Sequence, residues 1–133
     1  MQDRPTYSEL LEAIQHFIEA DVVSALEGPK KFHARVAANV LSIIRRELDS
    51  EEAELGTEWE GLDDVLGAEP RPSDRRALKA ALRRRTQDLC ARIRGGEADS
   101  GEWRERVWRH VRQTVVAKLA VANPRYLGKE MEP

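Results

Sequence analysis

The chain has 133 residues, of which 41% are hydrophobic and 35% charged, and its formal net charge is -2. This balance is typical of one globular domain of about 100–200 residues, and it argues against a disordered tail or a strongly basic nucleic-acid-binding protein. A single cysteine, Cys90, excludes an intrachain disulfide. There is no apolar run near about 18 residues, so the sequence predicts a cytoplasmic protein without signal peptide or membrane span.

The first predicted helix begins at Thr6 and ends before Gly28-Pro29. Thr6 and Glu9 have the S/T-x-x-E spacing of a capping box, and a short connection then leads into the next helix. The two helices should therefore form an antiparallel hairpin. One side of the first helix is apolar except for a carboxylate, Asp21; its members are Tyr7, Leu10, Leu11, Ile14, Phe17, Ile18, Val22, Ala25 and Leu26.

Residues 32–48 are the most strongly patterned stretch, and we expect them to form the central helix of the core. The apolar side is wide enough for more than one neighbour; it holds Phe32, Val36, Ala37, Val40, Leu41, Ile43, Ile44 and Leu48. His33 and Glu47 project into it, and an unpaired buried polar group costs about 1–3 kcal/mol. We therefore expect Asp21 to pair with His33 or Arg35, and Glu47 with Lys118.

Residues 49–73 read as an acidic loop that can hold one short helix. The stretch contains three glycines and two prolines, and residues 47–69 carry ten acidic side chains. A short apolar pattern that Gly67 would end runs through Trp59, Leu62, Val65 and Leu66. Trp59 is either the anchor of an interface or a cover over the edge of the core.

The third long helix is predicted over residues 75–94, with Ser73 or Asp74 as its N-cap. Arg85 interrupts its apolar side, so its side chain either extends to solvent along its stem or meets a carboxylate. Residues 71–94 hold nine basic side chains, but the neighbouring acidic segment offers an internal counter-surface, which argues against nucleic-acid binding.

The last helix is predicted over residues 103–122. Its apolar residues keep helical spacing although several are β-branched, Lys118 points into their side, and Pro124 ends the helix. The fold class is therefore all-α: a single domain, residues 1–126, forming a bundle of four main helices plus a short helix in the acidic loop 49–73, followed by a flexible tail, residues 127–133.

The motifs of common enzyme sites are missing from the sequence. It has no glycine-rich phosphate loop, nucleophile elbow or H-E-x-x-H motif, and His16, His33 and His110 lie on three different predicted helices. We therefore predict no catalytic residue, no metal and no cofactor.

Several short segments, taken together, resemble a small helical family of unknown function. They are Arg4-Pro5, Leu10-Leu11, Leu26-Glu27-Gly28, Phe32-His33-Ala34-Arg35-Val36-Ala37-Ala38-Asn39, Arg46-Glu47-Leu48, Ala117-Lys118-Leu119 and Asn123-Pro124-Arg125-Tyr126. Members of that family accompany kinases that resemble aminoglycoside phosphotransferases, fused to their C-terminal end or encoded beside them, often near acyl-CoA dehydrogenases. The resemblance covers most of the chain except residues 49–73. This chain has no H-x-D catalytic loop and no D-x-D/G metal motif, so the resemblance implies association with a kinase and not kinase activity.

The resemblance and the polar pattern point to one set of residues: His33, Arg35, Asn39, Glu47, Lys118, Asn123, Arg125 and Tyr126. Two interpretations remain open. The set is either a polar framework that locks the second and last helices together, or the lining of a cleft between them that binds a phosphate or coenzyme A fragment through Arg35, Lys118 and Arg125. We expect a non-catalytic accessory or regulatory module whose partner is a phosphotransferase-like kinase and which can also form homo-oligomers. The alternative is a domain that binds a small anionic ligand.

Overall fold

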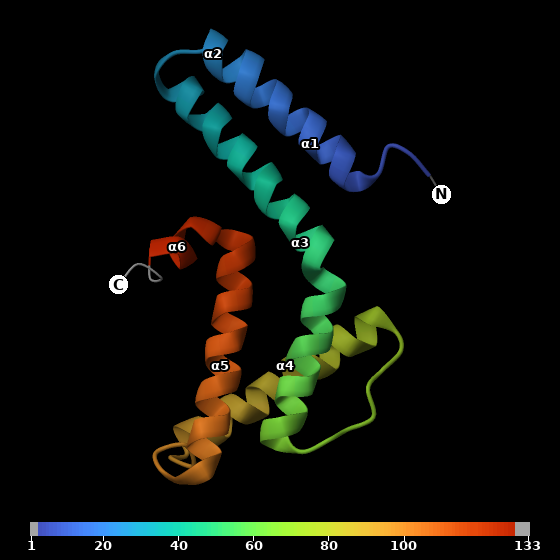
Figure 1. The fold of residues 1–133 in the computed structure, drawn as a ribbon, viewed down its shortest axis with the longest axis vertical. Coiled ribbons are helices and arrows are strands. Elements are labelled where there is room, and N and C mark those ends of the chain that lie inside the picture. Colours follow the sequence, from blue (N-terminus) through green and yellow to red (C-terminus); the bar gives the residue numbers. More distant parts are fainter. Residues whose placement is uncertain (1–2, 130–133) are drawn as a thin grey trace. The chain divides into compact units, whose positions relative to one another are not determined.

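A computed structural model describes residues 3–129, and these residues form helices and no strand. The all-α prediction is confirmed. In chain order (Figure 1) the elements are α1 Tyr7–Phe17, the π-helical turn η1 Ile18–Val22, α2 Val23–Ala25, α3 Gly28–Leu66, α4 Arg75–Arg94, α5 Gly101–Ala122 and α6 Pro124–Lys129.

The described residues fall into two compact units that share α3. The first unit comprises residues 3–51 and Val121–Asn123, and the second comprises Glu52–Ala120 and residues 124–129. The first half of α3 thus belongs to one unit and its second half to the other.

The first unit is built on the predicted helical hairpin. The capping box at its start is confirmed: the Thr6 N–H donates to Glu9 Oε2 at 2.6 Å, and the Glu9 N–H donates to Thr6 Oγ1 at 3.2 Å. From there α1 runs antiparallel to the first half of α3 (Figure 1). Two polar links join these helices, from Ser8 Oγ to Asp49 Oδ2 at 3.2 Å and from Arg45 to Glu12 at 3.3 Å.

Most of the apolar stripe of residues 32–48 is exposed, with Leu41 and Ile43 half-buried, and this contradicts its predicted place in the core. Phe32 is 64% exposed and Val40 46%, whereas Ala38 is the one buried residue among residues 3–51. The reason is geometric. The helix α1 packs on the side of Ala38, and Val36 and Val40 each stand two residues from it, about 200° around the helix.

The core lies in the second unit and includes the segment expected to be a loop. Helix α3 continues through the acidic residues to Leu66, and Gly67 ends it with φ 97°, in the left-handed region that glycine adopts at helix ends. Seven apolar side chains of α3, α4 and α5 form the buried cluster: Trp59, Leu62, Val65, Leu78, Leu82, Leu89 and Val107. Trp59 is therefore a core residue and not the exposed anchor of an interface.

The remaining boundaries follow the sequence closely. Helix α4 has the predicted bounds, and its N-cap is Asp74, which accepts from the Ala77 N–H at 2.7 Å. Helix α5 begins at Gly101, two residues before the predicted start, and α6 begins at Pro124. Residues 127–129, predicted as part of a flexible tail, continue α6, and residues 130–133 lie outside the described part of the chain. Between residues 3 and 129, no helix has the length and hydrophobicity of a membrane span.

Candidate functional site

The C-terminal end of α3 is the best-connected polar centre of the second unit. Arg85 of α4 is 0% exposed; its Nη1 donates to Asp63 Oδ1 at 2.6 Å, and its Nη2 donates to the Gly67 carbonyl at 2.6 Å. Its guanidinium also lies 4.6 Å from the centre of the Trp59 ring. Of the two predicted fates of Arg85, contact with a carboxylate is the one observed. A buried cation at this end of a helix also complements the helix dipole.

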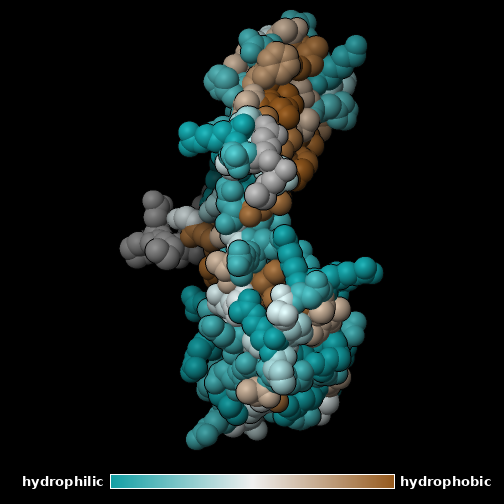
Figure 2. All heavy atoms as spheres, turned by 90° about the vertical axis from the view of Figure 1, so that its right-hand side faces the viewer, coloured by the Kyte–Doolittle hydropathy of each residue, from teal (hydrophilic) through white to brown (hydrophobic). Residues whose placement is uncertain are grey.

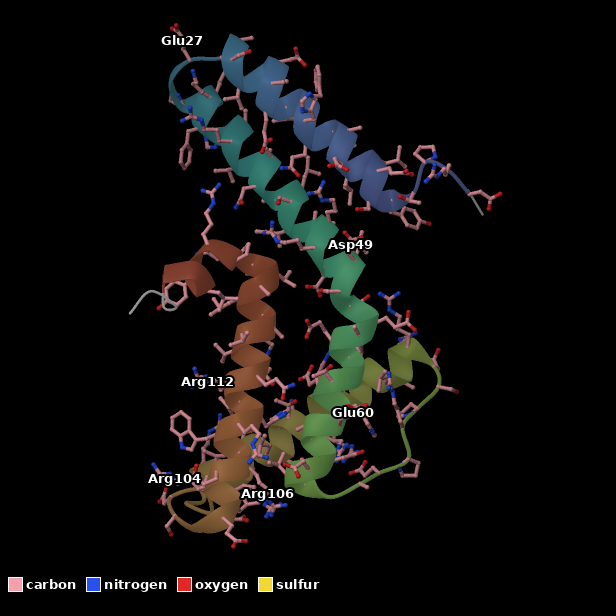
Figure 3. The ribbon with its side chains drawn as sticks, in the orientation of Figure 1. Glu27, Asp49, Glu60, Arg104, Arg106 and Arg112 are labelled. Carbon is pink, nitrogen blue, oxygen red and sulfur yellow. The ribbon has the colours of Figure 1, made fainter. Side chains whose placement is uncertain are left out.

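Helix α5 supplies two further donors to the same helix end. The indole Nε1 of Trp103 donates to the Val65 carbonyl at 2.7 Å, and Arg106 Nη1 donates to the Asp64 carbonyl at 2.9 Å. Figure 3 shows Arg106 on α5 beside the end of α3. The last carbonyls of a helix lack partners within the helix, so these bonds satisfy groups that would otherwise need water.

His110 of α5 is buried against the backbone of α3. It is 7% exposed, and a Cβ placed at Gly61 would lie only 2.3 Å from its Nδ1, so only glycine admits the ring here. Burial lowers the pKa of His110, the positive charge of Lys118 lowers it further, and Glu58 and Asp64 oppose this shift. The imidazole is therefore a neutral packing group at physiological pH.

An open groove of about 390 Å³ lies between α3, α4 and α5 in the second unit. Lys79 and Arg83 of α4 and Lys118 of α5 line it, together with Glu58 and Thr86. A second depression of about 500 Å³ shares Lys79 and Arg83 and adds Arg75 and Arg76. The lining of the first groove thus brings three basic side chains and one carboxylate together.

The predicted polar set is divided between the two units. His33, Arg35, Asn39 and Glu47 of α3 belong to the first unit together with Asn123, whereas Lys118, Arg125 and Tyr126 belong to the second. All eight side chains are exposed. The framework and the cleft both require the two units to be placed against each other, so both interpretations remain predictions.

The predicted ion pairs near the hairpin turn are not formed. Asp21, His33 and Arg35 are exposed, and within residues 3–129 no ion pair joins Asp21 to either base. His33 instead has an edge contact with Phe32, with ring centres 5.7 Å apart. The pairing was predicted because these residues were expected to be buried, and this part of the hairpin is exposed.

One residue of the segments that carry the resemblance makes a long-range contact within the first unit. Arg46 Nε donates to the Val121 carbonyl of α5 at 2.7 Å, and its Nη1 donates to Ser42 Oγ at 2.5 Å. Val121 lies in the last turn of α5, where carbonyls lack partners within the helix. Arg46 therefore fastens the end of α5 to α3.

Two glycines of the segment that was predicted as an acidic loop have a role in packing within the second unit. Gly56 and Gly61 lie inside α3, where the Arg71 guanidinium and the His110 ring approach them. Glycine within an otherwise helical, acidic stretch can mark close approach by another group. No cluster of three or more His, Cys, Asp or Glu side chains placed to hold a metal ion occurs in residues 3–129.

Comparison with known proteins gives one match. The model of the family described as "Domain of unknown function (DUF6285)" matches residues 24–126. No curated protein and no solved structure matches the chain.

Proposed function

Because the chain belongs to the DUF6285 family, a domain family of unknown function, we propose its role from its surfaces: it is a non-catalytic accessory module that binds a partner protein. The proposed partner is a small-molecule kinase of the aminoglycoside-phosphotransferase type. This part of the proposal rests on the resemblance of the segments around residues 32–48 and 117–126.

The exposed stripe of α3 carries the proposal. Phe32, Val36 and Val40 are 64%, 43% and 46% exposed and stand one helical turn apart. Apolar residues at this spacing are typical of a helix that lies in a groove of another protein. Their transfer from water stabilises a complex by about 25 cal/mol per Å² of apolar surface. Phe32 is the largest of the three and is the expected anchor.

Co-elution with a small-molecule kinase of the aminoglycoside-phosphotransferase type tests this role. The wild-type chain should form a complex at micromolar concentrations, and the variants Phe32→Glu and Val36→Glu should lose it because a charge would be buried in the contact. Lys30→Glu introduces the same residue at another exposed site of α3 and should retain the complex. The proposal would be abandoned if wild type and kinase eluted separately, or if all three variants bound equally.

The groove of the second unit favours a second candidate, a site for a small anionic ligand. Lys79, Arg83 and Lys118 supply positive charge, and Thr86 offers a hydroxyl. A thermal-shift series with inorganic phosphate, nucleotides and coenzyme A tests it. A ligand at 100 times its Kd should stabilise the fold by about 2.7 kcal/mol.

Substitutions then separate this groove from the cleft predicted from the sequence. Lys118→Ala should reduce the shift under either interpretation, but Arg83→Ala should reduce it only if the groove is the site. Arg35→Ala should reduce it only if the site is the cleft. A shift that survives all three substitutions would contradict both.

A further inference from the structure

Helix α1 exposes an apolar seam along one side. Tyr7, Leu10, Ile14 and Phe17 are 80%, 41%, 49% and 57% exposed, and their spacing of three, four and three residues is that of helices packed side by side in bundles and coiled coils. Each precedes by one position a half-buried residue of α1 or η1, namely Ser8, Leu11, Gln15 and Ile18. The half-buried positions face α3, so the seam lies about 100° away from that contact.

Helix α3 has a matching seam, whose residues also stand one position before the residues that face the other helix. Its polar links to α1 run through Arg45 and Asp49, and the buried Ala38 lies on the same side of α3 as these two residues. The residues that directly precede these three positions in the sequence are Ala37, Ile44 and Leu48. All three are exposed, Ile44 by 41% and Leu48 by 49%.

The equal offset places both seams on one face of the hairpin. Antiparallel helices are related by a two-fold axis perpendicular to the plane that contains them, and this rotation leaves each face of the pair in place. Residues one position before the contact positions therefore lie on the same face in α1 and α3. Figure 2, which looks onto the side where α1 lies, shows hydrophobic side chains gathered in the part of the molecule that holds the hairpin.

This face needs a second layer. Ala38 is the one buried residue among residues 3–51, and a layer of helices is stable only when its apolar side is covered by another layer. The exposed surface of the seam residues is on the order of 700 Å², close to the roughly 800 Å² that each partner contributes to a standard interface.

We propose that a second copy of this chain covers the face, so that two hairpins form a four-helix bundle around a two-fold axis. An isologous contact sets one surface against itself, and the seam suits this because its positions carry no charged side chain. Like charges would therefore not meet at its centre. The seam of α1 lies on a different helix from Phe32, Val36 and Val40, whereas Ile44 of the α3 seam stands one helical turn from Val40. The substitutions that test the dimer are therefore placed in α1, away from the proposed kinase contact.

Sedimentation equilibrium of the full chain between about 1 and 100 µM tests the proposal, because interfaces of standard size have Kd values from about micromolar to picomolar. The expected particle has twice the chain mass of 15.1 kDa. Leu10→Glu and Ile14→Glu should each give a monomer, because the interface would bury a charge. His16→Glu, at an exposed position on the side of α1 that points away from the seam, is the matched control and should remain a dimer.

Circular dichroism of each variant shows whether the hairpin stays helical. If the Glu variants lose helix, Tyr7→Ser replaces them: Tyr7 is 80% exposed in the protomer, so its loss should raise the dimer Kd at least tenfold without unfolding α1. A monomeric wild type would overturn the proposal, as would a dimer whose Kd is unchanged by the seam substitutions. Monomeric seam variants that still co-elute with the kinase would show that the two surfaces act separately.

Discussion

Replacement of Arg85 by alanine tests whether the end of α3 is the structural centre of the second unit. Arg85 is fully buried and holds Asp63 and the Gly67 carbonyl, each at 2.6 Å. Arg85→Ala would leave the Asp63 carboxylate with the Glu69 N–H as its donor at 3.3 Å and would remove the side-chain donor of the Gly67 carbonyl. It would also remove the cation above the Trp59 ring.

The magnitude follows from these contacts. Breaking a buried ion pair by removing one partner costs about 3–5 kcal/mol. The Asp63 side chain is 28% exposed, so water can reach it after the substitution, and we expect the lower end, about 3 kcal/mol. For a domain of this size that loss lowers Tm by about 10 °C. Arg85→Lys keeps the positive charge, so it should lower the free energy of unfolding by less than Arg85→Ala does. It should still be destabilising, because lysine lacks the planar guanidinium that forms both hydrogen bonds.

Urea denaturation followed by tryptophan fluorescence is the assay. Trp59, Trp103 and Trp108 are all the tryptophans of the chain, and all lie in the second unit, so the signal reports on that unit alone. Arg84→Ala is the control, because Arg84 is the exposed neighbour that pairs with Glu69 and Asp88. If Arg85→Ala shifted the urea midpoint no more than Arg84→Ala does, the reasoning would be refuted.

Two further predictions concern the contact between α3 and α5. Because burial lowers the pKa of His110, the unfolded chain binds more protons than the folded one below about pH 6.5, so stability should fall as the pH drops through that value. In His110→Gln, the urea midpoint should depend less on pH than it does in the wild type. An equal change of the urea midpoint with pH in both proteins would contradict the prediction. Gly61→Ala should destabilise the fold despite the better helix propensity of alanine, since its Cβ would lie 2.3 Å from His110 Nδ1. Gly56→Ala is the control: its Cβ would meet only the Arg71 guanidinium, at 3.5 Å, and the substitution should stabilise the fold by about 0.5–1 kcal/mol. If Gly61→Ala also stabilised the fold, the His110 ring could not lie against Gly61.

Local signals of the sequence predict most of the helix boundaries. The capping box of Thr6 and Glu9, the N-cap at Asp74, the stop at Gly67 and the break at Pro124 are all observed. Each signal depends on a few neighbouring residues, and the hydrogen bonds and backbone angles that these residues require at a helix end are the same in any fold. The apolar side of residues 75–94 is likewise buried as predicted.

The long-range features could not be derived from such signals. Arg85 interrupts an apolar stripe, and its two partners lie eighteen and twenty-two residues away in sequence. Gly61 is a helix breaker by propensity, and its role appears only when the His110 ring is seen beside it. The acidic composition of residues 49–66 suggested a loop, but a helix tolerates acidic residues on the side that faces solvent.

Hydrophobic periodicity identifies a face that needs a partner and does not identify the partner. Residues 32–48 have more apolar positions than residues 59–66, yet the shorter stretch is in the core, because Arg85, Trp103 and Arg106 fasten α4 and α5 to that end of α3. In the hairpin, the links from Ser8 and Glu12 to α3 fasten α1 on one side only. Apolar residues of α1 and α3 stay exposed in the hairpin. We propose two partners for them, a second copy for the seam and a kinase for the stripe through Phe32, and the two proposals need separate tests, oligomeric state for one and kinase binding for the other.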